Sequence, residues 1–168
     1  SKFAARFAWK TGTYTNTGSG NNGQAGIGFT DKSSFSSSET INTNGSGDVI
    51  NFLWHIGDNS SDGTQKVRTY SDGTGATGSN SSSNRQWTNN TTYYFELTYD
   101  GTTATCTRKT DSTYSTNHSW GSVVKATSGL TGLRYVVFGS QDNGNNQAGF
   151  TLTLNELKIQ SGVSEWIE

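Results

Sequence analysis

The stretch Thr91–Lys109, TTYYFELTYDGTTATCTRK, decides the predicted fold. Aromatic and apolar residues occupy every second position of Tyr93–Tyr99, and mostly polar residues lie between them. This alternation predicts a strand with one buried face and one solvent-facing face. Asp100-Gly101 follows, a dipeptide that favours a type I′ turn, in which both central residues need positive φ. Because a second alternating run covers Thr103–Arg108, the stretch predicts an antiparallel hairpin.

The same period-two pattern recurs along the rest of the chain, and no helical period of useful length accompanies it. Two long polar segments, 32–48 and 71–84, are interpreted as loops. In the last apolar run the alternation changes phase at Asn155-Glu156, which predicts a β-bulge. Outside the hairpin, the expected strands cover residues 3–9, 26–29, 49–56, 65–70, 120–126, 133–139 and 150–159.

Eight or nine short strands with polar connections predict an all-β fold, a two-sheet antiparallel β-sandwich or jelly roll. A closed barrel is the alternative architecture. The absence of a fixed internal period argues against a solenoid or propeller. We expect residues 1–168 to form a single domain. Because the chain begins directly in a strand pattern without an initiator Met, we expect this domain to be excised from a larger or mature surface protein.

The composition narrows the function classes. Only 29% of the residues are hydrophobic but 12% are aromatic, so the core should consist of large rings. No apolar run approaches the roughly 18 residues of a membrane-spanning segment. A net charge of −1 gives no electrostatic reason to expect nucleic acid as a partner. The single cysteine, Cys106, lies on the apolar phase of its strand, which favours a small buried side chain over a reactive thiol.

Several segments resemble those of one superfamily. Thr92–Leu97 with Tyr99–Thr102 is similar to a hairpin of the concanavalin A-like lectin/glucanase domains, in particular the laminin-G-like jelly rolls. Asp111–Thr116, Ser128–Tyr135 and Leu154–Ile159 resemble further structural features of laminin-G-like domains in microbial and viral surface proteins. The resemblance implies a jelly-roll fold. It implies sugar binding only by association, because enzymes, lectins and adhesion modules share this fold.

A candidate ligand-binding patch follows from strand parity. If the apolar phase of each strand faces the core, His55, Arg68, Tyr70 and Tyr94 face outward. We expect these four side chains to form one polar and aromatic patch if their strands are neighbours in one sheet. Aromatic rings pack against the C–H face of a pyranose, and polar groups bind its hydroxyls. Trp87, in a polar context before the hairpin, is a fifth candidate. The alternative is that these residues are ordinary surface decoration.

Catalysis is the least favoured function. Glycoside hydrolysis needs two carboxylates roughly 5 to 9 Å apart. The glucanases of the resembled superfamily carry a Glu-x-Asp-x-x-Glu run along a strand, which this sequence lacks; a pair assembled from different strands is the open alternative. No Gly-x-Ser-x-Gly elbow is present either. We therefore predict a protein that is not an enzyme and requires no cofactor.

Calcium is the one metal that the loops suggest. Domains of the resembled fold often bind Ca²⁺, and carboxylate and amide oxygens suit this hard cation. Asp58, Asp62 and Asp142 are the candidate ligands, since each lies in an oxygen-rich segment. The alternative is that these segments are ordinary turns rich in Asx residues. The two histidines are too few and too distant in sequence to predict zinc.

The sequence thus favours a non-catalytic carbohydrate-binding or adhesion module, extracellular or exposed on a cell or virion surface. Its expected partner is a glycan or surface polysaccharide, with no nucleic acid and no membrane span. The alternative is a structural subunit or decoration domain of a filament or capsid, which would contact copies of itself. Six Asn-x-Ser/Thr sequons would carry glycan only in a suitable secretory setting; they begin at Asn44, Asn59, Asn80, Asn89, Asn90 and Asn117.

Overall fold

The part of the chain that the structure describes folds into ten β-strands. The computed structural model describes residues 1–13, 23–34, 47–56, 64–71, 74–80, 88–127, 129–142 and 151–168. No helix occurs among these residues, and thus none that could cross a membrane. The strands are β1 (Phe3–Thr11), β2 (Gly23–Thr30), β3 (Val49–Ile56), β4 (Thr64–Ser71), β5 (Thr74–Asn80), β6 (Thr92–Tyr99), β7 (Thr103–Lys109), β8 (Asn117–Ala126), β9 (Tyr135–Asp142) and β10 (Leu152–Ser161).

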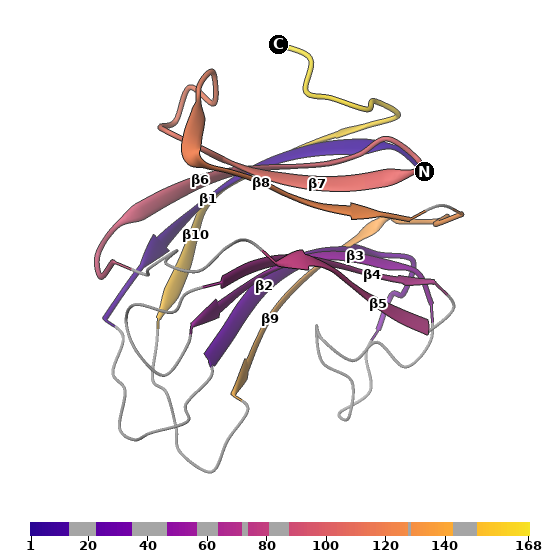
Figure 1. Ribbon diagram of the computed structural model, residues 1–168, viewed down its shortest axis with the longest axis horizontal. Coiled ribbons are helices and arrows are strands. Elements are labelled where there is room, and N and C mark those ends of the chain that lie inside the picture. The colour runs from indigo at the N-terminus through magenta and orange to yellow at the C-terminus, as the bar shows by residue number, and fades with distance from the viewer. Residues whose placement is uncertain are drawn as a thin grey trace.

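The strands form two five-stranded sheets that face each other (Figure 1). The first sheet has the order β10-β1-β6-β7-β8, and the second has the order β5-β4-β3-β2-β9. Every described pairing is antiparallel. The predicted two-sheet β-sandwich of jelly-roll type is therefore confirmed, and two separate sheets replace the barrel alternative. In Figure 1 the C-terminal segment lies on the far side of the first sheet from the second.

The core between the sheets consists of aromatic rings, as the composition predicts. Phe95 of β6 lies with its ring centroid 4.8 Å from that of Phe52 of β3 and 5.3 Å from that of Phe7 of β1. Trp54 of β3 meets Tyr93 of β6 edge to face at 4.7 Å. All five side chains are at most 2% exposed. Burial of such large apolar side chains is the main favourable term in the stability of the sandwich.

The β6–β7 hairpin forms as predicted, but its turn is not type I′. Gly101 has φ +102°, whereas Asp100 does not have positive φ. Instead, Oδ1 of Asp100 accepts hydrogen bonds from the backbone N–H groups of Thr102 and Thr103, both at 2.7 Å. The prediction of two positive-φ residues was wrong because the Asp side chain closes this turn itself, as in an Asx-turn.

The predicted bulge in the last strand is confirmed. Ala8 of β1 pairs with Glu156 of β10, but the next residue, Trp9, pairs with Leu154, so Asn155 is the extra residue. Both Leu154 and Leu157 thereby lie opposite core-facing residues of β1.

The largest error in the predicted strands is the loop assigned to residues 71–84. Thr74–Asn80 forms β5, which pairs with β4 at one end of the second sheet. Its sequence, TGATGSN, has no apolar alternation, so period-two analysis could not find it. Several other boundaries also differ. Strands β2 and β8 each begin three residues before the predicted start, at Gly23 and Asn117. Strand β9 begins two residues after its predicted start, at Tyr135, and ends three residues after its predicted end, at Asp142.

Two small residues are closely packed, and the burial of Cys106 confirms its sequence-based prediction. Cys106 is buried and forms no disulfide. Gly28 of β2 marks a close approach between neighbouring strands, because a Cβ there would lie 3.0 Å from Cγ1 of Val137 and 3.1 Å from Cβ of Asn51. The glycine thus lets the β3 and β9 side chains converge over β2.

Candidate functional site: the outer face of the β3–β4 pair

Strand β3 is buried on both faces. Ile50, Phe52 and Trp54 belong to the core cluster. Asn51 and Leu53, on the opposite face, are also 0% exposed. A fully buried Asn on the face turned away from the core is unusual, because burial of an amide is costly unless its polar atoms are satisfied.

Lys66 and Arg68 of β4 lie beside these two residues. The strand register places Arg68 opposite Asn51 and Lys66 opposite Leu53. Both cations are half-buried, and they alternate with Val67, which belongs to the core. The outer face of the β3–β4 pair therefore carries an amide and two cationic groups in adjacent register positions. We call Asn51, Lys66 and Arg68 the β3–β4 polar site.

The electrostatic environment of the β3–β4 polar site is unfavourable for positive charge. Burial lowers the pKa of Lys66, and the neighbouring Arg68 charge lowers it further. The Nε atom of Arg68 is buried and has no hydrogen-bond partner. Neither cation forms an ion pair within the part of the chain that the structure describes. These positive groups are therefore partly desolvated, and no described carboxylate compensates their charge.

The structure places the four residues of the predicted patch on two different sheets. Arg68 faces outward, as predicted. His55 and Tyr70 lie on the same strand pair, with His55 opposite Thr64 and Tyr70 opposite Val49 in the backbone register. Their side chains lie outside what the structure describes.

Tyr94 does not join the patch, so the prediction of one four-residue surface was wrong. It lies on β6, in the opposite sheet. It does face away from the core, and its ring meets that of Tyr114 edge to face at 5.8 Å. Strand parity identified the correct face of Tyr94 but carried no information about which sheet contains β6.

The remaining candidates fall outside the described residues. Trp87, Asp58 and Asp62 are among the residues that the structure does not describe. Asp142 ends β9, but its side chain is likewise not described. Within the described ranges, no three His, Cys, Asp or Glu residues lie close enough to hold a metal ion. Calcium binding by Asp58, Asp62 and Asp142 remains a prediction.

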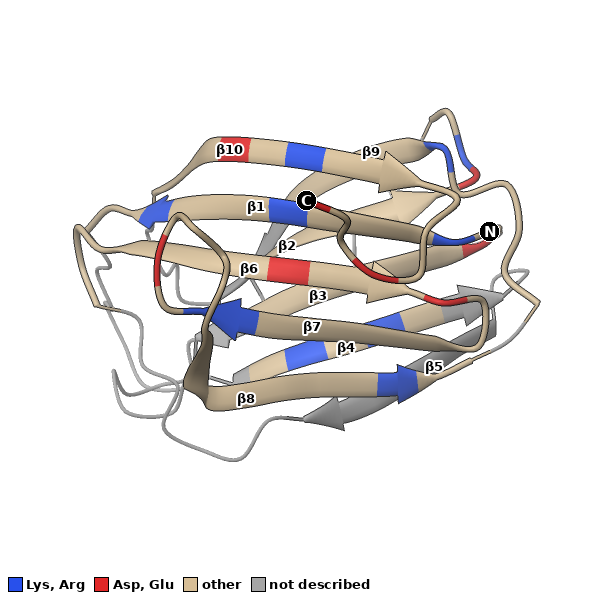
Figure 2. Cartoon of the chain, turned by 90° about the horizontal axis from the view of Figure 1, so that it is seen from above, with Lys and Arg blue, Asp and Glu red and all other residues tan. Residues whose placement is uncertain are grey.

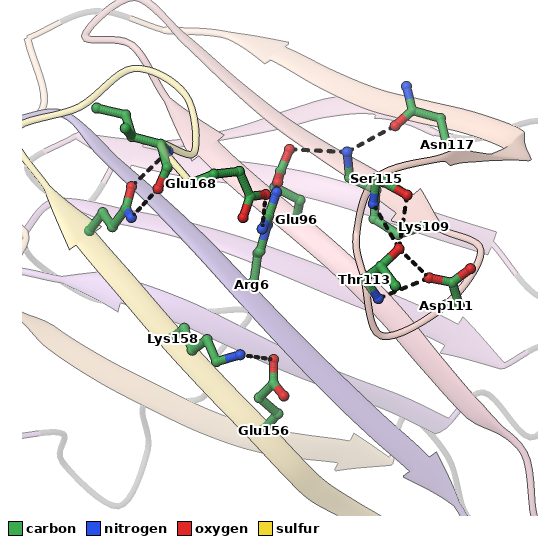
Figure 3. A network of polar contacts seen from close by, with 12 residues as sticks. Arg6, Glu96, Lys109, Asp111, Thr113, Ser115, Asn117, Glu156, Lys158 and Glu168 are labelled. Atoms are coloured by element: carbon green, nitrogen blue, oxygen red, sulfur yellow. Dashed lines mark hydrogen bonds and ion pairs between the residues drawn. The ribbon is translucent and has the colours of Figure 1, made fainter.

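A second polar cluster lies on the outer face of the first sheet (Figure 3). Nε of Arg6 donates to Oε2 of Glu96 at 2.8 Å, and Nη1 of Arg6 donates to Oε1 of Glu168 at 2.7 Å. Nζ of Lys109 lies 3.2 Å from Oε1 of Glu96 and donates to Oδ1 of Asn117 at 2.9 Å. These charges satisfy one another, unlike those of the β3–β4 polar site.

Aromatic rings enclose the Arg6 guanidinium. Its central carbon lies 4.6 Å from the centroid of Trp166 and 5.1 Å from that of Tyr114. Tyr114 is 2% exposed, and burial together with the nearby Glu156 carboxylate raises the pKa of its hydroxyl. The segment 162–168 and the β7–β8 connection therefore cover this face, which makes the cluster a structural clamp rather than an open binding site.

In a third cluster, a cation packs against two aromatic rings. The sequence analysis did not predict this cluster. The Arg108 guanidinium lies 3.8 Å from the centroid of Trp120 and 4.7 Å from that of Tyr93. His118 meets Trp120 edge to face at 5.3 Å, and its Nδ1 accepts the backbone N–H of Trp120 at 3.2 Å. Because Trp120 also contacts the core residue Trp54, we interpret this cluster as the polar margin of the core.

An apolar cavity of about 340 Å³ opens between the β9 and β10 sides of the two sheets. Phe138 of β9 and Leu154 of β10 are 49% and 38% exposed there. Both lie opposite core residues of the neighbouring strand, Ile27 and Trp9. Its lining side chains are apolar apart from the indole N–H of Trp9, and this Nε1 is buried without a hydrogen-bond partner among the described residues.

Comparison with known proteins adds evidence about the fold. No protein-family model matches the chain, and no curated protein sequence matches it. The solved structure of sheep galectin-11 in a complex with glycerol is similar, with a TM-score of 0.51 and 10% sequence identity, over 95% of this chain and 90% of that chain. The carbohydrate-binding module CBM66 from Bacillus subtilis gives a TM-score of 0.47 and 13% identity, over 96% of this chain and 76% of that chain.

The likeness to galectin-11 concerns the fold alone at this level of identity. The resemblance to the concanavalin A-like superfamily remains a prediction. The narrower resemblance to laminin-G-like domains remains a prediction.

Proposed function

We propose that this protein is a non-catalytic carbohydrate-binding module whose sugar site is the outer face of the β3–β4 pair. The site comprises Asn51, Lys66 and Arg68, with His55 and Tyr70 on the same two strands. Arg68 and Lys66 donate hydrogen bonds to sugar hydroxyls. Asn51, which is 0% exposed, lies opposite Arg68 in the strand register.

One observation carries the proposal: the Arg68 Nε is buried on the non-core face of the sheet without a hydrogen-bond partner. A buried donor without an acceptor costs about 1 to 3 kcal/mol, and such groups are rare in native proteins. A ligand that orders the Arg68 guanidinium and supplies oxygen acceptors would offset this cost. Sugar hydroxyls are oxygen acceptors of this kind.

The fold supports the same proposal. The similar galectin-11 structure contains glycerol, as its description states, and glycerol presents hydroxyl groups as a sugar does. On the outer face of the first sheet, the charges of Arg6, Glu96 and Lys109 already satisfy one another.

The wider role that we propose is adhesion or glycan recognition at a cell or virion surface, outside the cell. The partner would be a glycan or surface polysaccharide. A structural subunit of a filament or capsid is the alternative, and it would require no ligand on the β3–β4 face.

The test is a glycan array, followed by calorimetry with the glycans that the protein retains. We expect Arg68→Gln to lose retention while its thermal midpoint stays close to that of the wild type, because Arg68 is half-buried and its Nε has no hydrogen-bond partner among the described residues. Tyr94→Ala is the matched control on the opposite sheet, and it should retain glycan. Equal retention by Arg68→Gln would refute the site. No retention of any glycan would favour the structural alternative.

A further inference from the structure

We propose that the sugar bound by this module is anionic, with a sulfate or carboxylate group held between Lys66 and Arg68. This inference rests on the proposed function and deepens it, because it names the chemical class of the ligand. Neither the fold nor its likeness to galectin-11 distinguishes a neutral sugar from an acidic one.

The geometry brings the two cations to one place. Lys66 and Arg68 are two residues apart on β4, so their side chains leave the same face of the strand. Their Cα atoms are about 7 Å apart at the usual rise of an antiparallel strand. Both side chains are long enough to converge on one anionic group of a ligand above this face. Arg68 can bind such a group through two parallel N–H donors.

No negative charge within the surrounding strands balances this pair. Strands β2, β3, β4 and β5 contain no Asp or Glu, and Lys66 and Arg68 are their only Lys or Arg residues. Figure 2 shows these basic positions on β4. Asp142, at the end of β9, is the acidic residue in this sheet.

Cations of the first sheet behave differently. Arg6 and Lys109 both contact Glu96, and Lys158 lies 3.2 Å from Glu156. Three cations on the outer face of the first sheet, Arg6, Lys109 and Lys158, thus contact carboxylates. The outer face of the other sheet keeps Lys66 and Arg68 together without such a partner among the described residues. This contrast favours a ligand that brings its own negative charge.

The energetics agree with the geometry. Two like charges at close range repel each other, and partial burial strengthens this repulsion because it reduces solvent screening. The lowered pKa of Lys66 reflects both effects. An anionic group between the two side chains would replace this repulsion with two attractive contacts. A neutral hydroxyl would leave most of the repulsion in place.

The experiment compares matched pairs of glycans on one array. In one kind of pair, the same oligosaccharide is printed with and without a sulfate group. In the other kind, a uronic acid in one member is replaced by the corresponding neutral sugar in the other. We expect the charged member of a pair to bind about tenfold more tightly, the difference made by one favourable charge contact. The preference should weaken as salt rises, because the charges are partly exposed. Inorganic sulfate and a single-stranded DNA oligonucleotide serve as competitors in calorimetry.

Three variants assign the effect to the cation pair. Lys66→Gln should weaken binding of the charged member about tenfold more than binding of the neutral member, so that the preference is lost. Lys66→Arg keeps the positive charge and should therefore keep the preference for the charged member. This result would exclude misfolding as the reason for the loss in Lys66→Gln. Lys10→Gln removes one positive charge from an exposed position on β1 in the opposite sheet, and it should leave the preference unchanged.

The outcomes separate the two proposals. Equal binding of the charged and neutral members would refute the anionic ligand and leave the carbohydrate-binding function intact. No binding of either member would refute both. If inorganic sulfate competed at the concentration of the sulfated sugar itself, the site would be a simple anion site. If the DNA bound as tightly as the sugar, the site would recognise polyanions in general. Either result would overturn the proposal.

Discussion

Arg6 of β1 and Glu96 of β6 form an ion pair across the first sheet, with Nε of Arg6 2.8 Å from Oε2 of Glu96. The two residues are register partners, so the pair is held by the backbone of two central strands. Their side chains are only 10% and 15% exposed. Loss of Glu96 therefore removes the largely buried carboxylate of the pair and leaves Arg6 with only the exposed carboxylate of Glu168.

This pair provides the first prediction. Glu96→Gln should lower the free energy of unfolding by about 3 kcal/mol, because Arg6 and Lys109 then lose the carboxylate that they share. Chemical denaturation monitored by circular dichroism measures the change.

The matched control for Glu96 is the other carboxylate on Arg6. The Glu168 side chain is 78% exposed, so Glu168→Gln should change stability by no more than about 1 kcal/mol. Equal losses in the two variants would show that burial does not govern the energy of this cluster.

The second prediction concerns the core. Phe95 is 0% exposed and contacts aromatic rings from both sheets, so Phe95→Ala should cost about 3 to 5 kcal/mol. Val124→Ala, at a site 40% exposed, should stay within about 0.5 kcal/mol of the wild type. A negligible loss for Phe95→Ala in the same denaturation experiment would mean that the facing of β6 is reversed.

The third prediction concerns the β6–β7 turn. Gly101 has φ +102°, a conformation that is unfavourable for a β-branched residue. Gly101→Val should therefore destabilise the protein by about 1 to 2 kcal/mol. Gly101→Asn should lose less, since Asn adopts positive φ more readily than Val. Identical thermal midpoints for the two variants would contradict the strain argument.

The fourth prediction concerns acid stability. The backbone N–H and hydroxyl of Thr102, then the N–H of Thr103, lower the pKa of Asp100 below its ordinary value of 3.8. A carboxyl group with a lowered folded-state pKa stabilises the protein above its unfolded-state pKa, and this contribution disappears as the pH falls through the folded-state pKa. Asp100→Asn should thus be less stable than the wild type near neutral pH.

The difference between Asp100→Asn and the wild type should shrink progressively below pH 3.8, the ordinary value. Urea denaturation in a series of buffers from neutral to acidic pH measures it. A difference that stays constant through this range would show that the charge of Asp100 does not stabilise the turn.

The sequence predicted most strands because their buried faces are marked by aromatic residues at every second position. Phe95 and its strand neighbours are the clearest case. Thr74–Asn80 was not predicted as a strand because its residue types do not favour one. It is a strand because it pairs with β4. Tertiary pairing outweighs local propensity in such a segment.

The candidate site was predictable only in part. Parity identified Arg68 as outward-facing, and the same rule could have selected Lys66, two residues earlier. Asn51 was missed because nothing in a polar residue on a strand reveals that it is fully buried. Tyr94 was misplaced because the pairing of strands distant in sequence decides which sheet contains β6.

Strand β5 ends the second sheet, and this position has a consequence for aggregation. An unpaired sheet edge presents N–H and C=O groups that can template another strand, and natural proteins protect such edges with lysine, proline or other charged residues. This chain contains no proline, and β5 has no charged residue. At high concentration, edge-to-edge growth should therefore begin at β5, and a lysine introduced into this strand should suppress it.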